Sequence, residues 1–156
     1  MIRKMTKEDL PRILELEAEL FPSSPWPEHE FIYELDENPF ADVRVYEEDG
    51  KILGYIDWWV TYEQAQLANI AVASEAHRRG IGQKMIDLCV NECIKAECEN
   101  LSLEVRVNNM PAIRLYEKNG FIAAGIRKAY YEDGTDAWLM VKPLGGLEYD
   151  DNITGN

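Results

Sequence analysis

Residues 67–87, LANIAVASEAHRRGIGQKMID, constrain the fold of this chain more than any other segment. Leu67–Val72 alternates without a glycine or proline, which predicts a strand with Ala68, Ile70 and Val72 on one face. A polar loop follows, and from Ile81 onward apolar residues recur at the spacing of one helix face. These residues are Ile81, Met85, Leu88, Cys89 and Cys93. A further predicted strand at 101–105 would require a right-handed crossover if the two strands are parallel.

The loop between this strand and helix predicts an anion site. It contains His77, Arg78 and Arg79 in an otherwise acidic chain, and Gly80 and Gly82 stand where the loop becomes helix. Glycine allows backbone N–H groups to approach a ligand, and a helix N-terminus offers unpaired N–H groups with partial positive charge. Phosphates are the natural ligand of such a site. A simple tight turn would have the same Gly-x-Gly pattern, and the loop matches neither a Walker A loop nor a dinucleotide fingerprint.

The remaining pattern predicts a single α/β domain. Thr6 caps a first helix that ends before Pro22, and Pro27 suits the first position of a second helix. The turn signal Asp49-Gly50 joins two antiparallel strands. Strands are expected over 2–5, 43–47, 52–60, 64–72, 101–105, 123–130 and 137–141, and further helices over 28–35, 81–96 and 111–118. We expect a mixed, mostly antiparallel sheet flanked by helices over residues 1–144, followed by a polar, acidic and frayed tail over 145–156.

Composition narrows the class of partner. The net charge of −13 at pH 7 would repel nucleic acid and anionic membranes and attract an amine or a basic peptide, although it could serve solubility alone. The three cysteines form neither a disulfide framework nor a zinc set, so we expect buried thiols and no metal. The N-terminal residues lack the apolar core of a signal peptide, which favours the cytoplasm.

Two side chains have the chemistry for proton transfer. Glu104 alternates with Leu103 and Val105, so it faces away from the apolar side of its strand and can point into a cleft. The phenol of Tyr116, on the following helix, can donate a proton. Structural roles are the commoner ones for both residue types, namely a solvated or paired strand carboxylate and a buried core tyrosine.

A family resemblance adds to these observations. Asn69-Ile70-Ala71-Val72 followed by Arg78-Arg79-Gly80-Ile81-Gly82 resembles the acetyl-CoA motif of the GNAT superfamily of N-acetyltransferases, except that His77 stands where the family has Gln or Arg. The runs 103–109 and 112–121 closely resemble the ribosomal-protein-alanine N-acetyltransferases within it. This resemblance implies Glu104 as proton acceptor and Tyr116 as proton donor. It also implies acetyl-CoA contacts from Ile70, Ala71, Val72, Arg78, Arg79, Gly80, Ile81, Gly82 and Asn109.

Three functions follow as hypotheses. The first is acetyl transfer to the α-amine of a ribosomal protein with an alanine-type N-terminus, in a groove walled by Trp26, Tyr130 and Tyr131, by a monomer or weak dimer. An α-amine with a pKa near 8 is deprotonated more easily than a lysine amine near 10.4. The second is acetylation of a small amine, such as a polyamine, an amino acid or an antibiotic. Independently of the acceptor, the Trp26 loop could be a core plug rather than a substrate wall. The third is a non-catalytic acyl-CoA-binding module, which would need neither Glu104 nor Tyr116.

Overall fold

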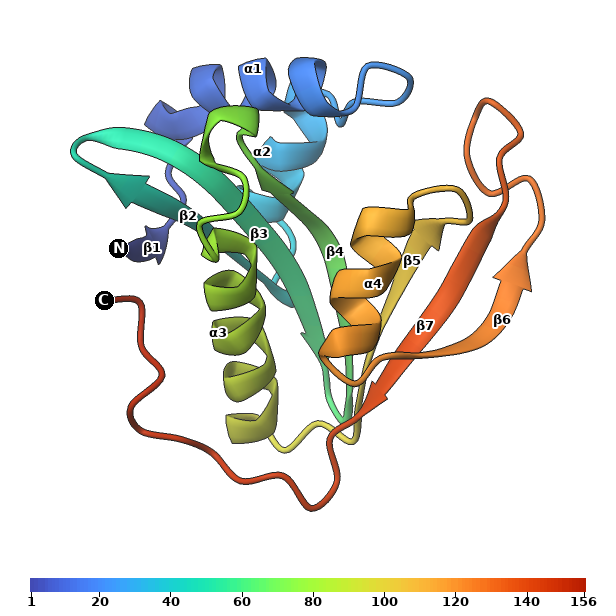
Figure 1. Ribbon diagram of the computed structural model, residues 1–156. Coiled ribbons are helices and arrows are strands. Elements are labelled where there is room, and N and C mark those ends of the chain that lie inside the picture. The colour runs from blue at the N-terminus through green and yellow to red at the C-terminus, as the bar shows by residue number, and fades with distance from the viewer.

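The computed structural model describes residues 1–156 and forms one seven-stranded sheet in the order β1-β2-β3-β4-β5-β7-β6 (Figure 1). Neighbouring strands are antiparallel except for β4 and β5, which are parallel. The strands are β1 (Ile2–Lys4), β2 (Ala41–Glu48), β3 (Lys51–Thr61), β4 (Gln64–Val72), β5 (Asn100–Arg106), β6 (Ile122–Arg127) and β7 (Ala137–Pro143). The helices are α1 (Leu10–Leu20), α2 (Glu28–Asp36), α3 (Ile81–Lys95) and α4 (Met110–Lys118), with short 3-10 helices at Lys7–Asp9 and Ser74–Ala76.

Helices cover both faces of the sheet. On one face, apolar residues of α1 and α2 pack on β2 and β3, with Ile13, Leu16, Phe31, Val45 and Tyr55 fully buried. On the other face, α3 and α4 pack over β3, β4, β5 and β7, and this cluster contains the predicted helix residues Ile81, Met85, Leu88, Cys89 and Cys93. All three cysteines are reduced and buried, as expected. Apolar surface is therefore buried on both faces of the sheet, in two separate core clusters.

The sheet opens between β4 and β5. The two strands pair only where Gln64–Gln66 faces Asn100–Ser102, and beyond this point they diverge (Figure 1). The β3–β4 register shifts between Asp57 and Trp58, which leaves Ala68 as an extra residue in β4. Such a bulge bends its strand and increases the twist, so it accounts for the divergence. The opening exposes one backbone edge of β4 from Ile70 onward to a ligand.

The structure confirms the predicted fold class and corrects some boundaries. The strands β4 and β5, whose relative direction the sequence left open, are parallel. The first helix starts with a 3-10 turn, in which the side chain of Asp9 accepts from the Thr6 N–H at 2.8 Å. Strand β6 ends at Arg127, so Tyr130 lies in the loop rather than in the strand. The bulge also interrupts the alternation of β4, because Leu67, Ile70 and Val72 pack toward α3 while Ala68 lies at the bulge itself.

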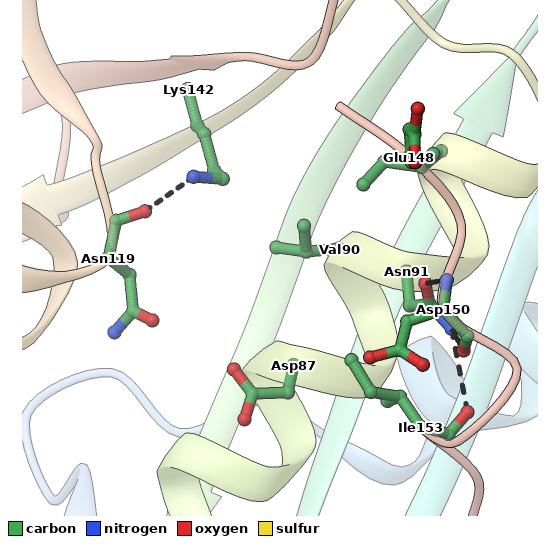
Figure 2. Close-up of a pocket in the computed structure, with 9 residues that line it drawn as sticks. Asp87, Val90, Asn91, Asn119, Lys142, Glu148, Asp150 and Ile153 are labelled. Carbon is green, nitrogen blue, oxygen red and sulfur yellow. Dashed lines mark hydrogen bonds between the residues drawn. The ribbon is translucent and has the colours of Figure 1, made fainter. Parts of the chain in front are cut away.

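The expectation of a frayed tail is wrong. Residues 145–156 pass over α3 toward β1, and the Ile2 N–H donates to the carbonyl of Gly155. Asn91, only 3% exposed on α3, accepts from the Asp150 N–H and donates to the Asp150 carbonyl, both at 2.9 Å. Figure 2 shows the cleft that this segment forms with α3, Asn119 and Lys142. None of the helices combines the length and hydrophobicity that a membrane span requires.

Candidate active site

The loop before α3 presents free backbone donors at the opening of the sheet. Gly80 caps α3 in the left-handed region, with φ of 78°, which strongly favours glycine. The N–H groups of Arg78, Arg79, Gly80, Ile81 and Gly82 donate no hydrogen bond within the protein. A Cβ at Gly82 would lie 3.6 Å from Val72 and 3.9 Å from Leu115, so the start of α3 is wedged between the end of β4 and α4. These donors fit the diphosphate of a coenzyme A ester.

The three basic side chains of this loop do not form a cluster of free positive charges. Arg79 pairs with Glu48 of the β2–β3 hairpin, with N–O distances of 2.5 and 2.7 Å, so its charge is largely neutralised. Arg78 is exposed and makes no ion pair within the protein. His77 Nε2 lies 2.8 Å from the Val72 carbonyl and ties the loop to the end of β4. Backbone N–H groups, rather than a cluster of free cations, are therefore the main donors that this loop offers to an anion.

Glu104 lies on the face of β5 opposite α3 and α4, as the alternation predicts. Its side chain is 11% exposed. One oxygen accepts from Arg127 Nε at 3.0 Å, and the other accepts from Gln66 Nε2 at 3.1 Å. Gln66 is the last β4 residue paired with β5, so Glu104 stands directly beyond the point where the strands separate. A carboxylate at this position can receive a proton from an amine that enters the opening.

Tyr116 and Asn109 belong to α4, on the other side of the opening. Burial, with a contribution from nearby Tyr131, raises the pKa of the Tyr116 phenol well above its usual value. The phenol is protonated at physiological pH, as a proton donor must be, and the raised pKa makes it a weaker acid than a free phenol. The ring packs edge-on against Phe121 at 5.7 Å between centroids. The Asn109 side-chain oxygen caps α4 through the Ala112 N–H at 3.3 Å, which leaves its amide nitrogen as a donor.

The three predicted wall residues divide into two loops. Trp26 lies between α1 and α2, half-buried against Phe31 with 5.4 Å between the rings, so it contributes to the core as well as to the surface. The backbone N–H of Trp26 donates at 2.7 Å to Glu17, a buried carboxylate that also accepts from Tyr55 and Asn69. Tyr130 and Tyr131 pack edge-to-face in the β6–β7 loop. Burial chiefly raises the Tyr131 pKa, to about 12, and the charge of Glu104 contributes to the same shift.

Sequence reasoning missed the side chains that connect these parts. Glu104 is bonded by Arg127 and Gln66 from neighbouring strands. Glu17 of α1 accepts a hydrogen bond from the Trp26 backbone, nine residues further along the chain. A polar residue within the apolar pattern of α1 was a signal for Glu17. The register that brings β6 next to β7 and β7 next to β5 was needed to place Arg127.

Comparison with known proteins decides the family. Residues 10–121 match the model of the Acetyltransferase (GNAT) family. The chain belongs to the GNAT acetyltransferases. It is 42% identical over 140 residues to the putative ribosomal protein bS18-alanine N-acetyltransferase of Bacillus subtilis, covering 89% of this chain and 92% of the relative. The corresponding Escherichia coli K12 enzyme is 33% identical, covering 92% and 97%.

Solved structures agree with this assignment. The crystal structure of the Escherichia coli ribosomal-protein-alanine N-acetyltransferase has a TM-score of 0.81 at 31% identity, covering 99% of this chain and 98% of that one. Ard1 from Thermoplasma volcanium has a TM-score of 0.84 at 25% identity, covering 92% and 97%. This chain is therefore an acetyl-CoA-dependent N-acetyltransferase, and acetyl-CoA is its acyl donor.

Proposed function

We propose that this acetyltransferase modifies the α-amine at the N-terminus of a ribosomal protein that begins with alanine or another small residue. The observation that carries the proposal is that Glu104 shares one face of β5 with Arg106, which contacts both aromatic loops. Arg106, two residues further along the same face of β5, contacts Ser24 in the Trp26 loop and Asp133 in the Tyr130–Tyr131 loop. We take the carboxylate to face an acceptor passage whose two walls come from these separate segments.

The chemistry of the walls fits a peptide terminus. Tyrosine and tryptophan offer flat apolar surface with a polar tip, which suits an extended backbone and a small first side chain. The two relatives named above are described as alanine N-acetyltransferases of a ribosomal protein. Ribosomal proteins reside in the cytoplasm, which is the location we propose for this enzyme, as a monomer or weak dimer. A net charge of −13 attracts a basic terminal segment.

Each residue has one proposed role in the transfer. Acetyl-CoA supplies an activated thioester, held by the β4 edge (Ile70, Ala71 and Val72), the loop donors of 78–82 and the amide of Asn109. Glu104 accepts the proton that the α-ammonium must lose before attack, since only the neutral amine is nucleophilic. Tyr116 returns a proton to the departing sulfur from the α4 side. Donor and acceptor sites thus lie on opposite sides of the opening between β4 and β5.

A comparison of acceptors tests this proposal. Peptides that differ only in the first residue are assayed by thiol release from acetyl-CoA, each with a free or blocked N-terminus, beside a polyamine. We expect an alanine-starting free peptide to have the highest kcat/KM, and blocking to abolish turnover. Activity that survives blocking, a preference for a bulky first residue, or faster turnover of the polyamine would reject the assignment and support a small-amine acceptor.

A further inference from the structure

Arg106 is the last residue of β5, and its guanidinium joins three separate parts of the chain. One terminal nitrogen donates to both carboxylate oxygens of Asp133, at 2.9 and 3.1 Å. The other terminal nitrogen donates to Ser24 Oγ at 3.0 Å. The carbon between them lies 4.1 Å from the centre of the Tyr131 ring, a close cation–π contact. The side chain is 22% exposed, so these contacts are only partly screened by solvent.

The two loops that Arg106 contacts differ in how they are held. The loop of residues 21–27 is held by the bond from the Trp26 backbone N–H to Glu17, by the packing of Trp26 on Phe31, and by one internal bond from the Ser24 N–H to the Phe21 carbonyl. The loop of residues 128–136 is braced internally, since Asp136 accepts from the Ala129 N–H at 2.8 Å and the Tyr131 N–H donates to the Thr135 carbonyl at 3.2 Å. No strand or helix joins one loop to the other. Arg106 bonds to both of them, and Glu104 lies on the same face of β5.

We propose that Arg106 is a positioning residue that fixes the distance between the two acceptor loops, and thereby the width of the passage to Glu104. This inference rests on the proposed function, because it takes the space between these loops as the acceptor groove. The planar guanidinium is suited to the task, since it can stack on Tyr131 while its two terminal nitrogens donate in different directions. A lysine at this position would supply the charge at one point only.

Substitution of Arg106 and of each of its partners distinguishes its contact with the 21–27 loop from its contact with the 128–136 loop. Arg106→Gln releases both loops, Ser24→Ala releases only 21–27, and Asp133→Asn weakens only 128–136 while an oxygen remains for the Thr135 N–H. We expect Arg106→Gln to raise the acceptor KM about tenfold or more, as for a lost charge-assisted bond, with kcat changed less than threefold. The increase in melting temperature caused by acetyl-CoA should stay the same. Ser24→Ala or Asp133→Asn should have no added effect in the Arg106→Gln background.

Amide hydrogen exchange reports on the loops without reference to activity. In Arg106→Gln both loops should exchange faster, whereas Arg106→Lys should restore slow exchange in 128–136 alone. Arg3 is a matched control, since it also bonds two acidic side chains, Asp9 and Glu47, and is 27% exposed. It belongs to β1, at the opposite edge of the sheet. Arg3→Gln should lower the melting temperature and leave the acceptor KM and both loops unchanged.

Three results would overturn the inference. Unchanged loop exchange in Arg106→Gln would show that the contacts do not hold the loops. A lower kcat, a higher acceptor KM and weaker acetyl-CoA binding that appear together, and equally in Arg3→Gln, would show a general structural role. Faster loop exchange with an unchanged KM would show that groove width does not control acceptor binding. If the wild type acetylates only small amines, the proposed function fails, and the exchange result still decides whether Arg106 joins the loops.

Discussion

At the scale of single residues, Glu104 shares its carboxylate between Arg127 and Gln66. Both partners donate a hydrogen bond to it, which fixes the orientation of the carboxylate beside the opening. Arg127 is half-exposed at the end of β6, so an incoming ammonium group can compete with it for the same carboxylate. The pair therefore raises a direct question, namely whether Glu104 serves chemistry or only holds the end of β6.

Substitutions of the proposed proton acceptor, Glu104, and of the proposed proton donor, Tyr116, answer this question. Glu104→Gln keeps the shape and removes the base, and Tyr116→Phe keeps the ring and removes the acid. We expect each to lower kcat by ~100-fold or more, as for a lost general base or acid, with the dissociation constant of acetyl-CoA unchanged in calorimetry. Arg127→Gln is the matched control for Glu104, because it breaks the same ion pair from the other side. A loss in Arg127→Gln as large as that in Glu104→Gln would assign a structural role to the carboxylate.

Local pattern predicted the orientation of these residues but not their partners. Alternation in β5 placed Glu104 opposite Leu103, because side-chain direction along a strand has a period of two. The contacts of Arg106 with Ser24 and of Arg127 with Glu104 join segments 82 and 23 residues apart. The Arg127 contact depends on the register of β5, β7 and β6, and the Arg106 contact depends on how the loop between α1 and α2 meets β5, so no single segment encodes either. The neutralisation of Arg79 by Glu48 was hidden for the same reason.

At the scale of elements, periodicity predicted the strands and helices, while packing determined their irregular features. The bulge at Ala68 lies in an apolar run without glycine or proline, so no residue type marked it. The tail over 145–156 is polar and acidic, a composition typical of disordered termini. The tail is tied to the domain by Asn91 of α3, whose amide bonds the backbone of Asp150, and by the Ile2 N–H, which donates to the Gly155 carbonyl. A polar residue on the buried face of a helix was the only indication in the sequence.

The tail supports a prediction about stability. Asn91→Ala removes three hydrogen bonds to the backbone of Asp150 and Ile153, and we expect it to cost about 1–3 kcal/mol of unfolding free energy. In a chain that ends at Gly146 the same substitution should have almost no effect, since its partners are gone. Urea unfolding of the four proteins measures the coupling, with the exposed Asn152→Ala as control. Equal costs in both backgrounds would show that Asn91 acts within α3 and that the tail is not held.

At the scale of the whole molecule, charge has opposite consequences for the two substrates. With 29 acidic and 16 basic residues, the enzyme attracts a basic peptide and repels anionic acetyl-CoA at long range. In the proposed acetyl-CoA site, the free backbone donors at the start of α3 would compensate locally, because they act at contact distance. Salt screens the long-range part far more than the contacts, because the Debye length falls from about 30 Å at 0.01 M to about 3 Å at 1 M.

A salt series therefore distinguishes attraction of the acceptor from mere solubility. We expect the KM of a basic alanine-starting peptide to rise severalfold between low and high salt, through a slower association rate. A peptide with the same first residues and a neutral remainder should show little change, and the KM of acetyl-CoA should stay level or fall as repulsion is screened. Steady-state kinetics at fixed pH, with each substrate varied in turn, measures all three. If the basic and neutral peptides respond equally, the charge of −13 has no part in acceptor choice, and the walls around Glu104 must select the acceptor by shape alone.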